Sequence, residues 1–440
     1  DPHPLYSGFS NITIEGSGGF YMNGIALGDE AISTPIKIAH AENILIKDIF
    51  IEEYSQYHAM EIISVRNCLI ENVKVYGAYN PVSLENIPVG SFNIEAAYEV
   101  ISQAGAIPYD KTPCINITVD KCYFGKGRIN PTAQIKCAID FHDGHDDVTH
   151  ENITISNNIM SEMQLIAILL FRIKDLNIFG NIVNGCGKSF LSTRFTNSIM
   201  CFNATISNNF INNVGFANTN IADEAATINL YNCLDTNVVG NTIIDSFAYT
   251  IMFGNCNRVA FTGNTGMALL KNNTISDKDE FAMFILKGGD NITITGNNMA
   301  VQTTDTISSR LFTNTATNVY VAYNTFNINS IKDFNYMDDN IIAYGSYGVG
   351  DTITLKHSQK RYDATIYVLE IVGTGYSCVC LDNTFGLSTG IILSGNIAGD
   401  TPVLFTVKIN YLDNNTITIT DSIKTSLATD GYNTVKGTNT

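Results

Sequence analysis

Alternating apolar and polar residues recur along this chain in short runs, and most runs open with the same phrase. Asn152-Ile153-Thr154-Ile155-Ser156-Asn157-Asn158 returns as Asn291-Ile292-Thr293-Ile294-Thr295-Gly296-Asn297. Weaker copies begin at Asn11, Asn43, Asn67, Asn116, Asp175, Asn203, Thr236, Arg258 and Asn318. Successive copies start 22 (258 − 236) to 36 (152 − 116) residues apart, except for one interval of 49 (116 − 67). A variable period of this size is typical of a solenoid whose coils carry loops of different length.

Each copy of the phrase predicts a short strand that ends at a sharp corner. β-Branched residues favour the strand, and Asn or Gly tolerates the left-handed backbone conformation of a corner. A second apolar strand precedes most copies, as in Ala59–Ile63, Ala138–His142 and Ala167–Phe171. The spacing predicts an all-β chain with a right-handed parallel β-helix of about ten coils in residues 1–335, running from near residue 9 to near residue 330.

The pattern changes beyond about residue 340. Strand-like runs such as Val403–Ile409 and Thr416–Ile419 are separated by turn residues, as in Leu412-Asp413-Asn414-Asn415. This favours a small C-terminal antiparallel β-sandwich in residues 345–440. A solenoid needs a cap on its last coil, so we expect this domain to provide it and to serve trimerisation or carbohydrate binding.

Composition and charge narrow the class of protein. Hydrophobic residues make up 45% of the 440 residues, which is enough for a large core. The formal net charge of −17 argues against a nucleic-acid partner, which would need a basic face. No apolar run reaches the roughly 18 residues of a membrane span, so no membrane partner is expected. The chain begins at Asp1 without a recognisable signal peptide, so localisation cannot be read from it.

The ten cysteines show no metal-binding spacing. Cys68 and Cys122 lie at strand phrases, where a small apolar side chain can stack inside a coil. We therefore expect buried free thiols rather than disulfides or a zinc site, and we predict no cofactor. Several copies of Asn-Ile-Thr match a glycosylation sequon, but an Asn at a corner is better explained as structural.

A candidate active site follows from stacking. Alignment of the upstream strands on Ala59, Ala96, Ala138 and Ala167 puts Glu61, Tyr98 and Asp140 in one column, with Leu169 next. His142 lies two residues beyond Asp140 and so shares its face. Glycoside hydrolysis needs one carboxylic acid to protonate the leaving oxygen and a second carboxylate to attack or to activate water, about 5–9 Å away. Carboxylates two coils apart are roughly 9–10 Å apart at their Cα atoms, so Glu61 and Asp140 could fill these roles. The alternative is that both are solvated residues of an outer sheet.

Further candidates flank this column. His58 and Glu95 come one residue before the aligned alanines, near the corner, and Glu95 or Glu99 could be the second carboxylate. Tyr98 could be a platform for a sugar ring. Arg172 could bind an anionic group of a substrate.

Residues 140–150 hold three of the seven histidines and four acids. This segment could bind calcium, because an oxygen-rich loop with a Gly suits that ion. It could instead be a loop that supplies acid and base groups, or a plain polar loop between coils. The run Asp143–Asp147 does not match the spacing of a known calcium loop, so no metal is predicted.

Several of these segments resemble the pectate-lyase-like β-helix proteins of phage tailspikes and appendages. The segments are Ile38-Ala39-His40-Ala41-Glu42-Asn43-Ile44, His58-Ala59-Met60-Glu61-Ile62, Glu95-Ala96, residues 108–117 and His150-Glu151-Asn152-Ile153-Thr154-Ile155. The C-terminal runs Leu355-Lys356-His357-Ser358 and Thr416-Ile417-Thr418-Ile419 look like the small β-domain that ends some phage tail proteins. Together the helix segments cover about residues 38–330.

The resemblance implies a spike, usually a homotrimer, on a virion tail or a bacterial surface. It implies a bacterial surface polysaccharide or wall teichoic acid as partner. The leading hypothesis is a depolymerase that hydrolyses this glycan with paired carboxylates. Hydrolysis is favoured over β-elimination because the acidic chain shows no basic cluster to neutralise a uronate. The alternatives are a non-catalytic receptor-binding spike and a structural β-helix.

Overall fold

The structure is a computed structural model of the 440-residue chain. It describes residues 6, 8–21, 34–55, 57–79, 90–96, 111–141, 148–193, 199–216, 226–246, 249–270, 282–303, 310–314, 316–322, 324–328, 345–346, 352–354, 377–378, 391–397, 401–411 and 416–426. In these segments the chain is all-β. None of them contains a helix long and apolar enough to cross a membrane.

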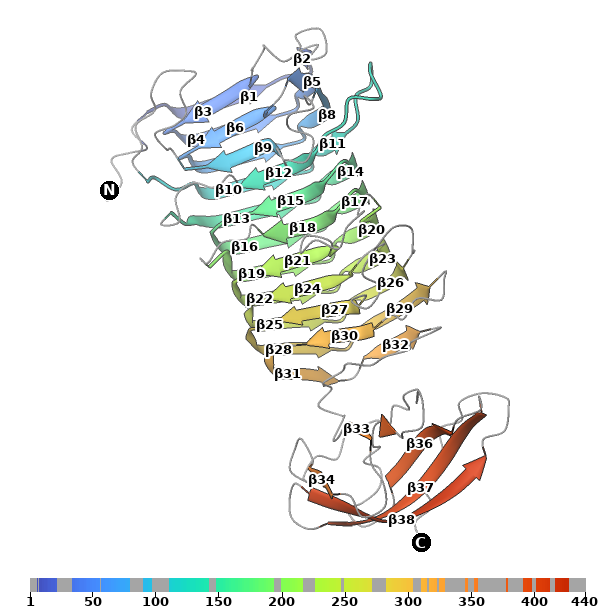
Figure 1. The fold of residues 1–440 in the computed structure, drawn as a ribbon. Helices are drawn as coiled ribbons and strands as arrows, with labels where there is room; N and C mark the ends of the chain where they lie inside the picture. The colour runs from blue at the N-terminus through green and yellow to red at the C-terminus, as the bar shows by residue number, and fades with distance from the viewer. Residues whose placement is uncertain are drawn as a thin grey trace.

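Three parallel sheets account for residues 10–328 (Figure 1). Sheet A consists of β1 (Ser10–Glu15), β4 (Glu42–Lys47), β7 (Arg66–Glu71), β10 (Ile115–Asp120), β13 (His150–Ser156), β16 (Ile173–Phe179), β19 (Cys201–Ser207), β22 (Cys233–Val239), β25 (Asn257–Thr262), β28 (Asp290–Thr295) and β31 (Thr317–Ala322). Sheet B consists of β2 (Gly19–Tyr21), β5 (Phe50–Ser55), β8 (Lys74–Tyr79), β11 (Tyr123–Gly125), β14 (Ile159–Met163), β17 (Ile182–Cys186), β20 (Phe210–Val214), β23 (Thr242–Ser246), β26 (Thr265–Leu270), β29 (Asn298–Thr303) and β32 (Thr325–Ile328). Sheet C consists of β3 (Ile36–Ala39), β6 (Met60–Ile63), β9 (Gly90–Glu95), β12 (Cys137–Phe141), β15 (Ile166–Leu170), β18 (Ser189–Thr193), β21 (Ile228–Tyr231), β24 (Ile251–Gly254), β27 (Ala282–Lys287) and β30 (Arg310–Asn314).

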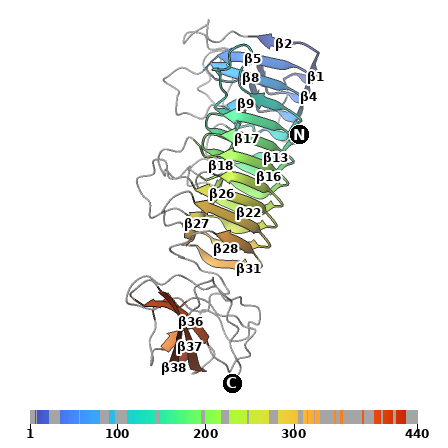
Figure 2. The same cartoon turned by 90° about the vertical axis from the view of Figure 1, so that its right-hand side faces the viewer.

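The chain visits the sheets in the order A, B, C and then repeats, so each coil contributes one strand to each sheet, except that the last described coil contributes only β31 and β32. Within these three sheets, strands pair in parallel with the strand three elements away, which belongs to the next coil; β1 with β4 and β10 with β13 are examples. The coils form a right-handed parallel β-helix, seen from two sides in Figures 1 and 2. This confirms the fold class predicted from the repeated phrase.

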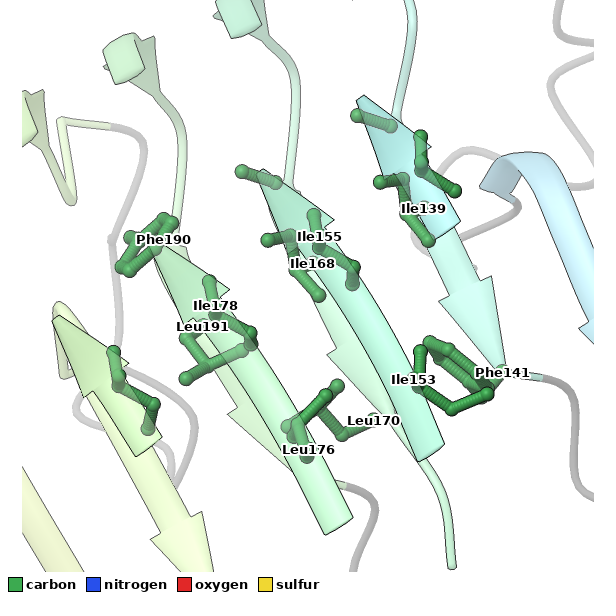
Figure 3. Packing of buried hydrophobic residues seen from close by; sticks show 14 of the residues in the cluster. Ile139, Phe141, Ile153, Ile155, Ile168, Leu170, Leu176, Ile178, Phe190 and Leu191 are labelled. Atoms are coloured by element: carbon green, nitrogen blue, oxygen red, sulfur yellow. The ribbon is translucent and has the colours of Figure 1, made fainter. Parts of the chain in front are cut away.

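The core lies inside the coils, where apolar side chains stack from one coil to the next. In β13, Ile153 and Ile155 point inward and are fully buried, while Thr154 between them points outward. Figure 3 shows such stacking across neighbouring coils, with Phe141 and Ile139 from sheet C in the same cluster. Burying one such side chain contributes about 1.5–3 kcal/mol relative to leaving it exposed.

The first residue of the repeated phrase, an Asn in most coils, lies at the corner that opens each sheet A strand. Its backbone is left-handed, with φ from +50° to +58° across the copies. The side chains form an exposed ladder in which Asn43 donates to Asn11, Asn67 to Asn43, Asn116 to Asn67 and Asn152 to Asn116, at 2.7–3.2 Å. The structural explanation of the sequon asparagines is confirmed. One copy begins a residue earlier than predicted, because Asp235 rather than Thr236 has the positive φ.

A second ladder of asparagines lies at the corner between sheets A and B and is buried. Asn181 shows the pattern: its Nδ2 donates to the carbonyl of Ile155 at 3.0 Å and to Oδ1 of Asn209 at 2.9 Å. Its own Oδ1 accepts from the backbone and side chain of Asn158. The same contacts recur along Asn158, Asn181, Asn209, Asn241, Asn264, Asn297 and Asn324. This ladder satisfies backbone groups that the corner leaves without strand partners.

The eight cysteines whose side chains the structure describes are buried free thiols, as predicted for Cys68 and Cys122. Cys201 and Cys233 stack in register inside the coils, with Sγ atoms 3.4 Å apart. Burial raises the pKa of Cys114 and of Cys122 to about 12. These thiols therefore behave as small core residues, not as nucleophiles.

Beyond residue 344 the described strands are antiparallel. β34 (Thr352–Thr354), β38 (Thr416–Ser426), β37 (Thr401–Tyr411) and β36 (Ile391–Ile397) form one four-stranded sheet in that order. β33 (Gly345–Ser346) and β35 (Ser377–Cys378) form a short pair. A second sandwich layer and a separate domain at residues 345–440 stay predictions.

Candidate active site on the outer face of sheet C

The outer face of sheet C carries a column of polar side chains over the second, third and fourth coils. β6 pairs with β9 so that Glu61 lies beside Asn93, and β9 pairs with β12 so that Asn93 lies beside Asp140. Glu61 and Asp140 are therefore two coils apart, about 9–10 Å between Cα atoms at the usual strand spacing. Leu169 follows Asp140 and ends the polar part of the column.

Asn93 occupies the place that the sequence analysis gave to Tyr98, so that part of the alignment is wrong. Met60 and Ile139 both pair with Phe92, which makes Ser91 the counterpart of Ala59 and Ala138. Ser91 is tolerated in this buried position because its hydroxyl hydrogen-bonds the hydroxyl of Tyr54 at 2.9 Å. The aligned Ala96 instead follows the end of β9.

Glu95 is also placed differently from the prediction. It lies beside Ile63, two residues after Asn93 on the same face, rather than at the corner before a strand. The strand spacing and rise put its Cα about 8 Å from those of Glu61 and Asp140. The carboxylates of Glu61, Glu95 and Asp140, with Asn93 in their centre, are called the acid cluster below.

Glu61 has an ion-pair partner and a hydrogen-bond partner among the described residues. Nζ of Lys37, its neighbour in the first coil, lies 2.5 Å from Oε2, and the hydroxyl of Thr34 donates to Oε1 at 2.9 Å. Lys37 thus offsets one of the three negative charges of the acid cluster. It was not singled out in the sequence, although its strand precedes the Glu61 strand by one coil.

Burial raises the pKa of the Glu95 carboxyl to about 7. A hydrogen bond from Asn93 lowers it, and the charges of Glu61 and Asp140 raise it. A carboxyl group with this pKa is partly protonated near neutral pH. This is the property that a general acid needs.

His58 lies just before β6 and is buried beside the cluster. Its Nδ1 lies 2.7 Å from the carbonyl oxygen of Gly90, to which it donates in the neutral ring. Burial lowers the pKa of His58, so the ring is neutral at neutral pH. It can support the strand that carries Asn93, or present Nε2 to a bound molecule.

The acid cluster is more buried than expected for side chains on an outer sheet. Asp140, Asn93 and Glu95 are 1%, 1% and 4% exposed, and Glu61 is 9% exposed. The carboxylates are therefore not solvated surface residues, which was the alternative in the sequence analysis. Because these side chains are buried, variants at these positions need a direct check of folding.

Three predicted site residues lie outside the described residues: Tyr98, Glu99 and His142. The run Asp143–Asp147, which was considered for calcium, does as well. In the segments that the structure does describe, no three His, Cys, Asp or Glu side chains are grouped closely enough to hold a metal ion.

Arg172 and His150 have structural roles at the corner between sheets C and A. Nε of Arg172 donates to the carbonyl of Val148 at 2.9 Å, and Nη2 donates to the hydroxyl of Thr149 at 3.2 Å. Nδ1 of His150 accepts from the backbone N–H of Cys114 at 3.0 Å, and burial lowers the pKa of His150 to about 4. Contact of Arg172 with a substrate stays a prediction.

Comparisons with known proteins give similar folds only. No protein-family model and no curated protein matches this chain. The surface adhesin PfbA of Streptococcus pneumoniae matches with a TM-score of 0.49 and 17% identity over 85% of this chain and 77% of that one. The enzymatically active domain of tailspike protein 2 of bacteriophage CBA120 matches at 0.47 and 10%, over 96% and 66%. A double mutant of the tailspike protein of E. coli bacteriophage HK620, in complex with a pentasaccharide, matches at 0.48 and 12%, over 95% and 74%. At these scores the fold assignment rests on the strand pairing of this chain itself.

Proposed function

We propose that this protein is a glycan depolymerase of the spike type, which binds and hydrolyses a bacterial surface polysaccharide at the acid cluster. The observation that carries the proposal is the grouping of Glu61, Glu95 and Asp140 on one face over three coils, with the pKa of Glu95 raised to about 7. Hydrolysis of a glycosidic bond needs one protonated and one ionised carboxyl group.

The spacing favours hydrolysis with inversion. Inverting enzymes keep their two carboxyl groups about 6.5–9.5 Å apart to leave room for a water molecule, whereas retaining enzymes keep them about 5–5.5 Å apart. The Cα separations of about 8 Å and about 9–10 Å in the cluster leave room for carboxyl groups at the longer spacing, and this supports the proposal of inversion. One carboxyl group would protonate the leaving oxygen while another activates water on the opposite face of the sugar.

The charge of the cluster favours a neutral or amine-bearing glycan. Three carboxyl groups face one described cation, Lys37, which is already paired with Glu61. A uronate or phosphate group placed there would meet like charge in a buried site. A neutral capsule or exopolysaccharide therefore fits better than wall teichoic acid, and β-elimination from uronic acids is disfavoured.

The test is a panel of purified capsules, exopolysaccharides and wall teichoic acids, each incubated with the full chain. Loss of viscosity together with new reducing ends on a neutral glycan supports the proposal. Unsaturated products would instead mean a lyase. Binding to a glycan without any cleavage would favour the second candidate, a receptor-binding spike. The deep burial of Asp140 is the observation that favours this alternative.

For assembly we propose a homotrimer with parallel axes, displayed on a virion tail or bacterial surface. Supporting it is an apolar column at the start of the sheet B strands, formed by Ile159, Ile182 and Phe210 in register. Each is 42–44% exposed. Contiguous exposed apolar residues mark contact surfaces. A column of them that runs along the helix axis suits a second copy of the chain, because its coils have the same spacing.

We expect Ile182→Lys or Phe210→Lys to convert the trimer to monomers in multi-angle light scattering. Thr242→Lys is the matched control, because Thr242 follows Phe210 in the same column but is polar. It should leave the trimer intact. A parent chain that is monomeric at micromolar concentration would contradict the assembly.

A further inference from the structure

The three carboxyl groups of the acid cluster have different contacts, and these assign them different roles in a reaction that rests on the proposed function. Asn93 is the central member: it is 1% exposed and lies between Glu61 and Asp140 in the column. Its side chain donates a hydrogen bond to the carboxyl group of Glu95, two residues along the same face. An amide group in this position contacts Glu95, whose Cα lies about 8 Å from the Cα atoms of both Glu61 and Asp140.

The oxygen of the Asn93 amide is the unusual feature. Oδ1 is buried and has no hydrogen-bond donor in the described part of the protein. A buried acceptor without a donor loses its hydration without compensation, so such atoms call for an explanation. A protonated Glu95 supplies one, because its O–H can donate to Oδ1 once the amide group turns over. After this rotation, the NH2 group of Asn93 lies between Glu61 and Asp140, its two carboxylate neighbours in the column.

We propose that Asn93 is a positioning residue that holds Glu95 as the proton donor of the acid cluster, leaving Glu61 and Asp140 for the activation of water. With Glu95 ionised, Nδ2 of Asn93 donates to it; with Glu95 protonated, Oδ1 accepts from it. The same side chain thus holds the carboxyl group in place before and after proton transfer. This assigns a role to a residue that the sequence alignment had missed.

The charged surroundings of Glu95 agree with this role. Glu61 from β6 and Asp140 from β12 disfavour its ionised form, and Lys37 from β3 favours it. His58 is neutral for the reason given above, and on the other side Sγ of Cys114 donates to the backbone carbonyl of Glu95 at 3.4 Å. His150 reaches this region through the backbone N–H of Cys114 and is neutral as well. The net effect of these groups and of burial is the pKa of about 7.

The experiment is a pH titration of the full chain without substrate, followed by infrared spectroscopy. The spectrum of Glu95→Gln is subtracted from that of the parent, so that the difference reports the carboxyl group of Glu95. The protonated carboxyl band of Glu95 should disappear with a midpoint near pH 7. In Asn93→Leu the midpoint should rise by roughly one unit, because the hydrogen bond from Asn93 lowers the pKa of Glu95 and therefore stabilises the ionised form more than the protonated form. Asn93→Asp, of nearly unchanged volume, should raise it as well and serves if the Leu variant does not fold. Lys47→Met, which removes a cation paired with Glu15 on sheet A, is the control and should change nothing.

If a glycan is cleaved, the fall of kcat/KM at alkaline pH should have the same midpoints as the infrared titration. We expect kcat to be at least tenfold lower in Asn93→Leu than in the parent. In Asn93→Gln, which keeps the amide group, kcat should be close to that of the parent. A Glu95 band that titrates in the ordinary carboxyl range, or a midpoint indifferent to Asn93, overturns the assignment. Because the infrared titration needs no substrate, it decides this point even if no glycan is cleaved and the proposed function fails.

Discussion

Replacing Asp140 by Asn, or Glu61 by Gln, is expected to lower the rate of glycan cleavage at least about a hundredfold, the usual scale for losing an acid or base group. Each change keeps the size of the side chain and removes one of the carboxylates that flank Asn93. The rate is measured as reducing ends released per unit time at saturating glycan.

Glu71→Gln provides the matched control for these variants. It makes the same chemical change on sheet A, where Glu71 is a surface residue paired with Lys121 at 2.7 Å, and an exposed ion pair contributes at most about 1 kcal/mol. Its activity should equal that of the parent. Because Asp140 and Glu61 are buried, thermal unfolding of each variant must accompany the assay. Full activity of both folded variants would move the site elsewhere, for example to a groove between chains.

The repeated phrase made the solenoid predictable because it reports a backbone requirement. Asn11, Asn116 and Asn291 recur at positions where φ is positive and few residue types are tolerated. The buried ladder was less visible, since Asn157 and Asn158 are adjacent and the sequence does not say which one points inward. Coils with Gly at the corner resolve this question in the sequence. In Gly180-Asn181, the glycine takes the positive φ, so the asparagine after it is the buried residue.

The candidate site was only partly predictable because the coils differ in loop length. Glu61 and Asp140 were aligned correctly, since both follow an alanine that points into the coil. The third coil has Ser91 at that point, and the nearby Ala96 misled the alignment. The alternation in β9 held the better signal, because Phe92 and Ile94 are apolar while Asn93 and Glu95 are polar.

The largest expected effect on stability comes from the buried ladder. Oδ1 of Asn209 accepts from the backbone N–H of Asn181 at 3.0 Å and from its Nδ2 at 2.9 Å, and Nδ2 of Asn209 donates to the carbonyl of Ile178 at 3.1 Å. Asn209→Ala leaves these buried groups without partners, each at about 1–3 kcal/mol. We expect a loss of about 3–5 kcal/mol in the free energy of unfolding.

Asn212→Ala is the control for this prediction, three residues further along the same coil. Nδ2 of Asn212 donates to Oδ1 of Asn184 at 3.1 Å in an exposed setting, where water replaces the lost partner. Its cost should stay below about 1 kcal/mol. Unfolding in denaturant measures both variants, and unfolding rates at elevated temperature replace it if refolding fails. Equal losses for the two variants would mean that stacking of apolar side chains, not the buried amide ladder, holds this corner together.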